Sequence, residues 1–327
     1  MEIIPNLDSV HDRISSPDWG IRFVLSMDVI NFTPTRAHLD IGLNDHDWVI
    51  RREYARRRDF VPTCEDVENG LSDEVEEVRI EWTKRMDFTP SPEQVHRGVK
   101  DLFDTIRKLW AQRMDWTPTP EQVERGLNDN EISVRTAWAS RTDFTPTLKQ
   151  VERGLMDANR DVRVAWVERM DRTPTHKQVE RGIKDDSPIV RVAWVKRMDW
   201  TPTPEQVESG LNDKDISVHS AWISRMDWVP TYEQVERGLN DRSVWVRIAW
   251  AQRMDWTPTY DHVEKGLCDP TANVRLAWVN RVDFTPTHEQ IERGLNESGK
   301  IKLAWMGRIK MEHEKLLESE SDIEASL

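Results

Sequence analysis

The sequence predicts an all-α solenoid built from about ten two-helix repeats of 28 residues each. Two columns of identical residues, each recurring every 28 residues, carry this prediction. A fixed period of 20–50 residues is the signature of stacked supersecondary units that bury one continuous core. The prolines are Pro34, Pro62, Pro90, Pro118, Pro146, Pro174, Pro202, Pro230, Pro258 and Pro286; the glycines run from Gly42 to Gly294 with the same step.

The period also divides the chain. We expect an N-terminal cap with a partial repeat over 1–30, the ten-repeat solenoid over 31–308, and an acidic C-terminal tail, helical or disordered, over 309–327. The chain has 327 residues and a formal charge of −13, and no apolar run approaches the roughly 18 residues of a membrane helix. The start has neither the basic nor the apolar segment of a secretion signal, so we expect no contact with a membrane.

Each repeat is predicted to begin with a short capped helix. Thr119 is an N-cap, Pro120 occupies the first helical position, and Gln122 completes a capping box. Val123 and Leu127 are four residues apart and share the buried face. Gly126 has two interpretations: a left-handed residue that ends the helix, which we favour, or a small residue that lets a neighbouring helix approach closely.

The second helix of each repeat is predicted to carry the core. Its N-cap positions include Asp47, Asn159, Ser187, Asp215, Ser243 and Thr271. On a helical wheel Val190, Ala193, Trp194, Arg197 and Met198 form one stripe. The aromatic column of this stripe is Tyr54, Trp82, Trp110, Trp138, Trp166, Trp194, Trp222, Trp250, Trp278 and Trp305, the last after a one-residue deletion.

These motifs carry a resemblance to a known family. The pattern V-R-x-A-apolar, a short gap, T-P-x₄-apolar and then a D before the next V-R resembles the leucine-rich-repeat variant unit, and more loosely short HEAT-like repeats. The resemblance covers nearly the whole chain. It implies a right-handed superhelical stack of helix pairs, in which 3₁₀ turns could form part of the second layer.

Charged columns also recur, and they have two interpretations. Arginines such as Arg191 and Arg197 could track a phosphate backbone, or they could form an Asp–Arg ladder between adjacent repeats with Asp199 and Asp213. We favour the ladder, because Arg197 falls inside the apolar stripe, where an unpaired charge is costly. The aromatic residue before Thr-Pro, such as Trp116, is interpreted as packing locally and less favourably as a base-stacking platform.

One segment near the N-terminus is strongly basic. Arg51, Arg52, Arg56, Arg57 and Arg58 all fall on one second helix. As a functional patch they would bind an anion, a nucleic-acid end or an acidic partner; otherwise they are a solvated face with two ladder positions. Both interpretations stay open. They make nucleic-acid binding the alternative function, although the acidic balance of the whole chain disfavours it.

Catalytic and metal sites are not predicted. The nine histidines are scattered, no nucleophile motif or phosphate loop occurs, and Cys64 and Cys268 lie far apart without ligand spacing. We therefore expect no enzyme activity, no metal and no small-molecule cofactor. The two cysteines favour a reducing, cytoplasmic location.

The variable positions of the second helices are the predicted binding surface. In helix-pair solenoids the second helices line the concave side, where such columns would meet a partner. Their mixed chemistry suits another protein or an extended peptide, so we predict a scaffold, adaptor or inhibitor. The columns are Lys84, Gln112, Ser140, Glu168, Lys196, Ser224, Gln252 and Asn280, flanked by Thr136, Val164, Val192, Ser220, Ile248 and Leu276.

Overall fold

The computed structural model describes residues 15–26, 33–169 and 171–311, and every regular element in these ranges is helical. This confirms the predicted all-α class. The chain divides into two compact units, residues 1–171 (unit 1) and 172–327 (unit 2). Each unit is described by itself. Most of the predicted tail lies outside the described residues, and the predicted boundaries at 30 and 308, the repeat number and the handedness stay predictions.

The helices alternate between two kinds along the chain. After α2 (Trp19–Ser26), the first helices are α3 (Arg36–Leu43), α5 (Cys64–Leu71), α7 (Pro92–Gly98), α9 (Pro120–Leu127), α11 (Leu148–Gly154), α13 (His176–Gly182), α15 (Pro204–Leu211), α17 (Tyr232–Leu239), α19 (Tyr260–Leu267) and α21 (His288–Leu295). The second helices are α4 (Trp48–Arg56), α6 (Glu76–Thr83), α8 (Asp104–Gln112), α10 (Ile132–Ala139), α12 (Arg160–Glu168), α14 (Pro188–Lys196), α16 (Ile216–Ser224), α18 (Val244–Gln252) and α20 (Ala272–Val279).

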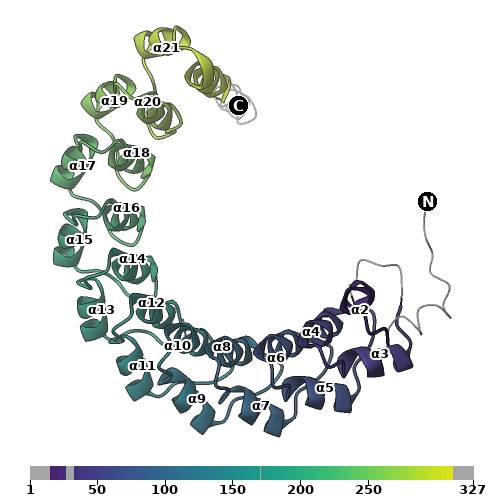
Figure 1. The fold of residues 1–327 in the computed structure, drawn as a ribbon. Coiled ribbons are helices and arrows are strands. Elements are labelled where there is room, and N and C mark those ends of the chain that lie inside the picture. The colour runs from purple at the N-terminus through teal and green to yellow at the C-terminus, as the bar shows by residue number, and fades with distance from the viewer. Residues whose placement is uncertain (1–14, 27–32, 170, 312–327) are drawn as a thin grey trace, which may run out of the picture. The chain divides into compact units, whose positions relative to one another are not determined.

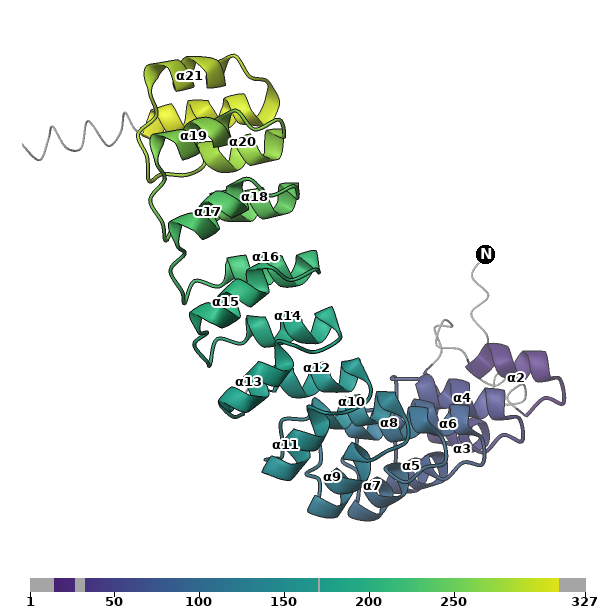
Figure 2. The same cartoon turned by 90° about the vertical axis from the view of Figure 1, so that its left-hand side faces the viewer.

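Within each unit the helices form two layers. The second helices make the inner layer and the first helices the outer layer (Figure 1). Inside a unit, second helices pack against their own first helices and against the second helices of neighbouring repeats, as α10 does against α9, α8 and α12. In unit 2 the pairs follow one another as successive levels (Figure 2). Helices of seven to nine residues are too short to be stable alone, so their stability comes from these contacts.

The first helices begin as predicted. In α9 the Gln122 backbone N–H donates to the Thr119 hydroxyl at 3.3 Å, and the Thr119 N–H donates to the Gln122 side-chain carbonyl at 2.8 Å. Pro120 occupies the first helical position. The same capping box is present from α3 to α21, with His38, Asp66 or His262 replacing glutamine in three repeats. The predicted capping box is confirmed.

The second helices begin at the predicted N-caps, but not all of these residues cap with their side chains. Asp47, Asn159 and Asp215 accept hydrogen bonds from helix N–H groups. The side-chain caps predicted at Ser187, Ser243 and Thr271 are wrong. At each second helix from α4 to α20 an aspartate two residues before the cap, such as Asp129, accepts the cap residue's own N–H.

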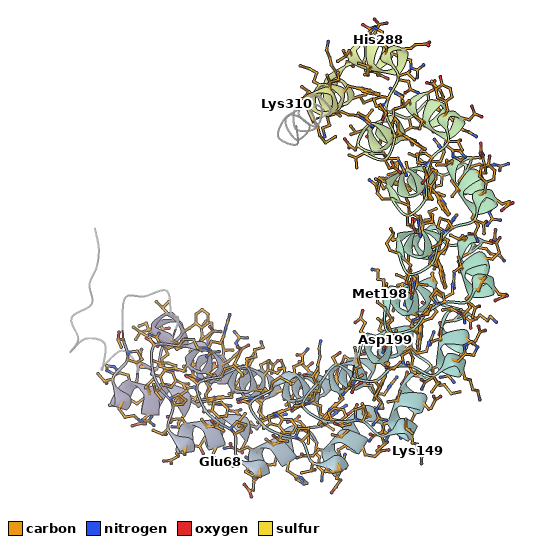
Figure 3. The ribbon with its side chains drawn as sticks, turned by 180° about the vertical axis from the view of Figure 1, so that it is seen from behind. Glu68, Lys149, Met198, Asp199, His288 and Lys310 are labelled. Carbon is orange, nitrogen blue, oxygen red and sulfur yellow. The ribbon has the colours of Figure 1, made fainter. Side chains whose placement is uncertain are left out.

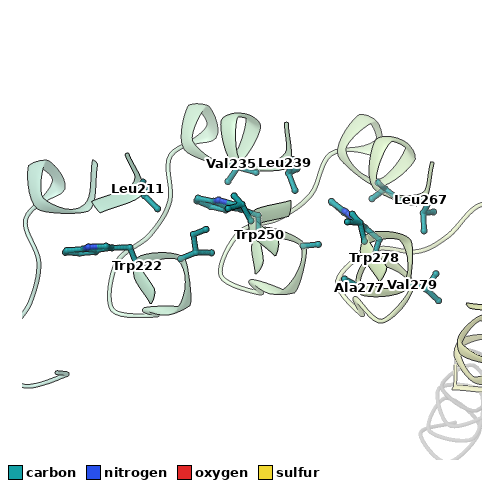
Figure 4. Packing of buried hydrophobic residues seen from close by; sticks show 14 of the residues in the cluster. Leu211, Trp222, Val235, Leu239, Trp250, Leu267, Ala277, Trp278 and Val279 are labelled. Carbon is teal, nitrogen blue, oxygen red and sulfur yellow. The ribbon is translucent and has the colours of Figure 1, made fainter. Parts of the chain in front are cut away.

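The tryptophan column is the core, as predicted. Trp222, Trp250 and Trp278 of unit 2 are each 1% exposed and repeat in one row (Figure 4). Each packs among the branched side chains of its neighbours, for example Val235 and Leu239 around Trp250. A buried tryptophan removes about 200 Å² from water, on the order of 5 kcal/mol per repeat.

The glycines of the repeat leave room for the tryptophan side chains, and our favoured interpretation of this column was wrong. Among the described residues only Gly299 has a positive φ, so Gly126 does not end α9 in the left-handed conformation. A Cβ added to Gly126 would lie 2.1 Å from the Trp138 indole nitrogen. The glycine is therefore the small residue on which the indole of the second helix rests, and the same geometry recurs at Gly238 and Trp250.

One residue of the predicted stripe faces solvent. Met198 is 58% exposed, because α14 ends at Lys196 and the chain leaves the helix before residue 198. The helical wheel therefore does not apply there. Equivalent residues in both units are also exposed: Met86, Met114, Met226, Met254 and Val282.

Candidate functional site: the exposed face of the second helices

The first arginine column is a structural ladder, as we favoured. Arg141 is 2% exposed, and its guanidinium forms two hydrogen bonds with the Asp143 carboxylate, at 2.9 and 2.5 Å. It also donates to the backbone carbonyls of Ala111 (2.8 Å) and Arg113 (2.6 Å) in the preceding repeat, and to that of Trp116 (3.1 Å). Arg141 therefore ties two repeats together through groups that would otherwise be unpaired.

The second arginine column forms another ladder, in which each arginine pairs with a carboxylate of the next repeat. Arg107 donates to both Asp129 oxygens at 2.7 and 2.8 Å, and to the carbonyls of Asp101 and Leu102. The hydrogen bond to Asp129 raises the pKa of Arg107; at Asp129 burial opposes ionisation, but Arg107 still lowers the pKa of the carboxyl. The column predicted around Arg191 is thus paired: Arg51–Asp73, Arg79–Asp101, Arg135–Asp157, Arg191–Asp213, Arg247–Asp269 and Arg275–Glu297.

A third ladder crosses the outer layer and was not predicted. Glu124 of α9 accepts hydrogen bonds from Gln150 at 2.9 Å and Arg153 at 2.7 Å, both in the next first helix. These bonds lower the pKa of Glu124 to about 2. Glu208 is held in the same way by Arg237 and Gln234. The 28-residue recurrence of the Glu and Gln columns was the available signal. Figure 3 shows Glu68, of the same column, on the outer layer.

The aromatic residues before Thr-Pro belong to the same framework. Trp116 packs edge-on against Trp138 of its own repeat, with ring centroids 6.0 Å apart. The Arg141 guanidinium lies 4.4 Å from the Trp116 centroid. One face of the ring is therefore covered by a cation, which supports the packing interpretation over the base-stacking platform.

The basic segment predicted near the N-terminus is largely neutralised within the chain. Arg51 pairs with Asp73, and Arg57 is 1% exposed and pairs with Asp59, so these two are ladder positions. Arg52 and Arg56 both contact Glu53. The prediction that all five arginines fall on one helix is wrong, because α4 ends at Arg56. Arg58, beyond that end, donates to backbone carbonyls, and burial, with the nearby Arg85, lowers its pKa.

The predicted binding residues lie on the exposed face of the second helices. We call this surface the inner face and define it by three columns of the inner layer. All residues of the third column are exposed; those of the second are half-buried. The first column was not predicted and consists of Val49, Glu77, Thr105, Ser133, Asp161, Ile189, Ser217, Trp245 and Asn273. The second is Arg52, Ile80, Lys108, Thr136, Val164, Val192, Ser220, Ile248 and Leu276. The third is Arg56, Lys84, Gln112, Ser140, Glu168, Lys196, Ser224, Gln252 and Asn280.

A groove lies on this surface in unit 1. Its volume is about 920 Å³, and it lies between α8 and α10 and is lined by residues that include Lys108, Gln112, Thr136 and Ser140. It is open, and its walls mix charged, polar and apolar side chains. Within the described residues no group of three His, Cys, Asp or Glu side chains is placed to hold a metal. No described helix has both the length and the apolar character needed to cross a bilayer.

Comparisons with known proteins agree with this architecture. The family model of the HEAT repeat associated with sister chromatid cohesion matches residues 121–137, across α9 and α10. A solved structure described as a leucine-rich repeat variant with a novel repetitive protein structural motif is similar over 73% of this chain and 88% of that chain, with a TM-score of 0.52 and 21% identity. No curated protein matches. The predicted resemblance is confirmed at the level of the fold: the chain is a helical repeat protein.

Proposed function

We propose that this protein is a non-enzymatic binding scaffold that holds another protein, or an extended peptide, against its inner face. One observation carries the proposal. The charged columns that recur in every repeat are engaged in contacts between repeats, whereas the exposed columns of the inner face change chemistry from one repeat to the next. Residues that hold a stack together recur, and residues that recognise a partner need not.

The surface has the character of a protein interface. Each repeat adds two or three side chains to the inner face, and the groove between α8 and α10 is open in the way that suits a polypeptide better than a small molecule. A scaffold, an adaptor and an inhibitor would all use such a surface. Cys64 and Cys268 are free and exposed, which supports our placement of the protein in the reducing cytoplasm.

Nucleic-acid binding is the weaker candidate. It depended on arginine columns that would follow a phosphate backbone, and those arginines pair with aspartates of neighbouring repeats. Arg56 remains the most exposed arginine of the basic helix, and it contacts Glu53. An observed affinity for DNA or RNA that falls steeply with salt would restore this candidate.

The proposal is tested by charge reversal on the two layers. The inner-face variant carries Lys84→Glu, Glu168→Lys and Lys196→Glu; the control carries Glu121→Lys, Lys149→Glu and Lys177→Glu on exposed positions of the first helices and has the same net charge. Both proteins are used as bait in lysate of the native host, with bound proteins identified by mass spectrometry. We expect a specific partner to be lost from the inner-face variant and retained by the control. Retention of every partner by both variants would reject this surface.

A further inference from the structure

The inner face of unit 2 is almost free of charge. Among its three columns on α14, α16, α18 and α20 the one charged residue is Lys196. The same columns of unit 1 carry many charges: Arg52, Arg56, Glu77, Lys84, Lys108, Asp161 and Glu168.

Large apolar side chains replace the charges in unit 2. Within the three columns Trp245 is 68% exposed and Ile189 is 49% exposed, and the half-buried Val192, Ile248 and Leu276 lie beside them. The exposed Ile216 and Met226 do not distinguish the two units, because Ile132 and Met114 hold the same positions in unit 1. A series of exposed apolar residues on adjacent helices is unusual for a surface that only meets water.

The fold itself does not require this composition. Unit 1 has the same second helices, the same capping geometry and the same tryptophan core, and it accommodates Glu77 and Lys108 at the positions where unit 2 has Trp245 and Ile248. The lack of charge in unit 2 is therefore a property of its exposed surface rather than of its packing. A ligand explains it better than stability does.

Resting on the proposed function, we propose that the inner face of unit 2 binds an amphipathic α-helix of the partner protein through that helix's uncharged, apolar side. The charge pattern selects this chemistry: a charged side chain buried there would find no counter-charge except near Lys196, and leaving it unpaired is costly. Methionine, such as the exposed Met226, is flexible and adapts well to apolar side chains of varied shape.

The spacing of the columns selects a helix among polypeptide conformations. Packed helices lie about 8–10 Å apart, so each column presents one side chain at about that interval. Residues seven apart on an α-helix are separated by about 10.5 Å and share a face, which matches the interval. Alternate residues of an extended strand are about 6.7 Å apart and do not match. Polyproline grooves are lined by several aromatic rings, whereas this face carries Trp245 alone.

A display experiment tests the proposal with the full chain. The probe is a phage-displayed library of 21-residue helical peptides, in which two heptad positions on one side are varied to all residues. We expect the enriched peptides to carry uncharged apolar residues at the varied positions. The unit 2 variant Ser220→Glu with Met226→Glu should bind them about tenfold more weakly, because its carboxylates would be buried against apolar side chains.

The control changes the same two columns in unit 1, as Thr136→Glu with Met114→Glu, and should bind the peptides as the unaltered protein does. Thermal unfolding of each variant shows that both remain folded. Enrichment of charged peptides, equal weakening by both variants, or no enriched peptide would overturn the proposal. So would dissociation of a self-associated form by the unit 2 variant alone, since the occupant would then be a second copy.

This outcome is separable from that of the proposed function. If the host partner is lost from unit 1 charge variants and retained by the Ser220→Glu, Met226→Glu variant, the scaffold function stands and the assignment to unit 2 fails. If no host partner depends on either face, the scaffold function fails as well, whatever the peptides do.

Discussion

Units 1 and 2 share one framework and differ in what they expose. In both, an arginine such as Arg141 or Arg253 is buried against the preceding repeat, and a glycine lies under an indole. The inner face of unit 1 is charged and that of unit 2 is almost uncharged. The comparison distinguishes residues that hold the repeats together from residues that can differ between the units. It predicts that equivalent substitutions in the framework lower the free energy of unfolding equally in both units, whereas substitutions on the inner face affect partner binding unequally.

The largest expected effect is loss of a buried arginine. Arg141→Ala in unit 1 and Arg253→Ala in unit 2 should each lower the free energy of unfolding by about 3–4 kcal/mol, because a carboxylate and several backbone carbonyls lose their donor. Urea denaturation measures both values. A difference of more than about 2 kcal/mol between them would break the claim of a common framework.

Next is the glycine contact. Gly126→Ala and Gly238→Ala each place a methyl group 2.1 Å from an indole nitrogen, so the two helices must move apart. We expect a loss of about 2–3 kcal/mol from overpacking in each unit. Gly307→Ala is the control, since a Cβ there meets no atom within 4 Å. Hydrogen exchange of the tryptophan indole N–H groups would locate the disturbance in the altered repeat.

The ladder has one irregular position, and repairing it should stabilise the protein. In unit 2 His219 occupies the place of Arg107, facing Asp241. His219→Arg should add about 1 kcal/mol to the free energy of unfolding by forming the missing pair, and Arg107→His should remove a similar amount. If His219→Arg destabilised the protein, the column would not be a simple ladder in unit 2.

The same histidine should make the stability of the protein depend on pH. Burial, more than the charge of Arg237, lowers the pKa of His219 below its ordinary 6.5, although Asp241 and Asp213 oppose the shift. The unfolded chain then binds a proton more readily than the folded one, so stability falls as the pH drops through 6.5. Thermal unfolding between pH 8 and 5 should show this dependence in the native chain and a weaker one in His219→Arg.

The outer ladder should contribute little. Glu124 in unit 1 and Glu208 in unit 2 both have a pKa of about 2, lowered by Arg153 and Arg237. Their stabilisation is present above pH 4.5 and is lost as the pH falls towards 2. Because both pairs are exposed to solvent, each Glu→Gln change should cost less than about 0.5 kcal/mol at pH 7. The difference from the native chain should narrow below pH 4.

Substitutions on the inner face should change the stability of the protein least. Ser220→Lys in unit 2 imitates Lys108 of unit 1 and should change the free energy of unfolding by no more than about 0.5 kcal/mol. A large loss would mean that unit 2 is uncharged for reasons of packing, and the inference of a ligand there would lose its basis.

The 28-residue period of the sequence predicted most of the fold. Columns of Pro, Gly and Trp predicted helix boundaries and core, because stacked repeats place equal residues in equal environments. Gly126 was misinterpreted because the residue that requires a glycine there is Trp138, which is twelve residues away and on another helix. Met198 was misplaced because the helix ends two residues earlier. Arg141 donates some of its hydrogen bonds to backbone carbonyls of another repeat, and no pattern of side chains in the sequence reveals such contacts.

The binding columns were predicted from their variation and stay a proposal, whereas the framework columns were predicted from their recurrence. What variation alone did not show was the difference in charge between the two units, which appears only once the exposed columns of each unit, such as that of Trp245, are compared.

The central claim is that the variable inner face, and not the recurring columns, binds the partner. Its most direct test is the affinity of the host partner for the triple inner-face variant Lys84→Glu, Glu168→Lys, Lys196→Glu, compared with the matched outer-layer variant at Glu121, Lys149 and Lys177. The account predicts a Kd at least about tenfold weaker for the first and unchanged for the second. Equal affinities for both variants would contradict it.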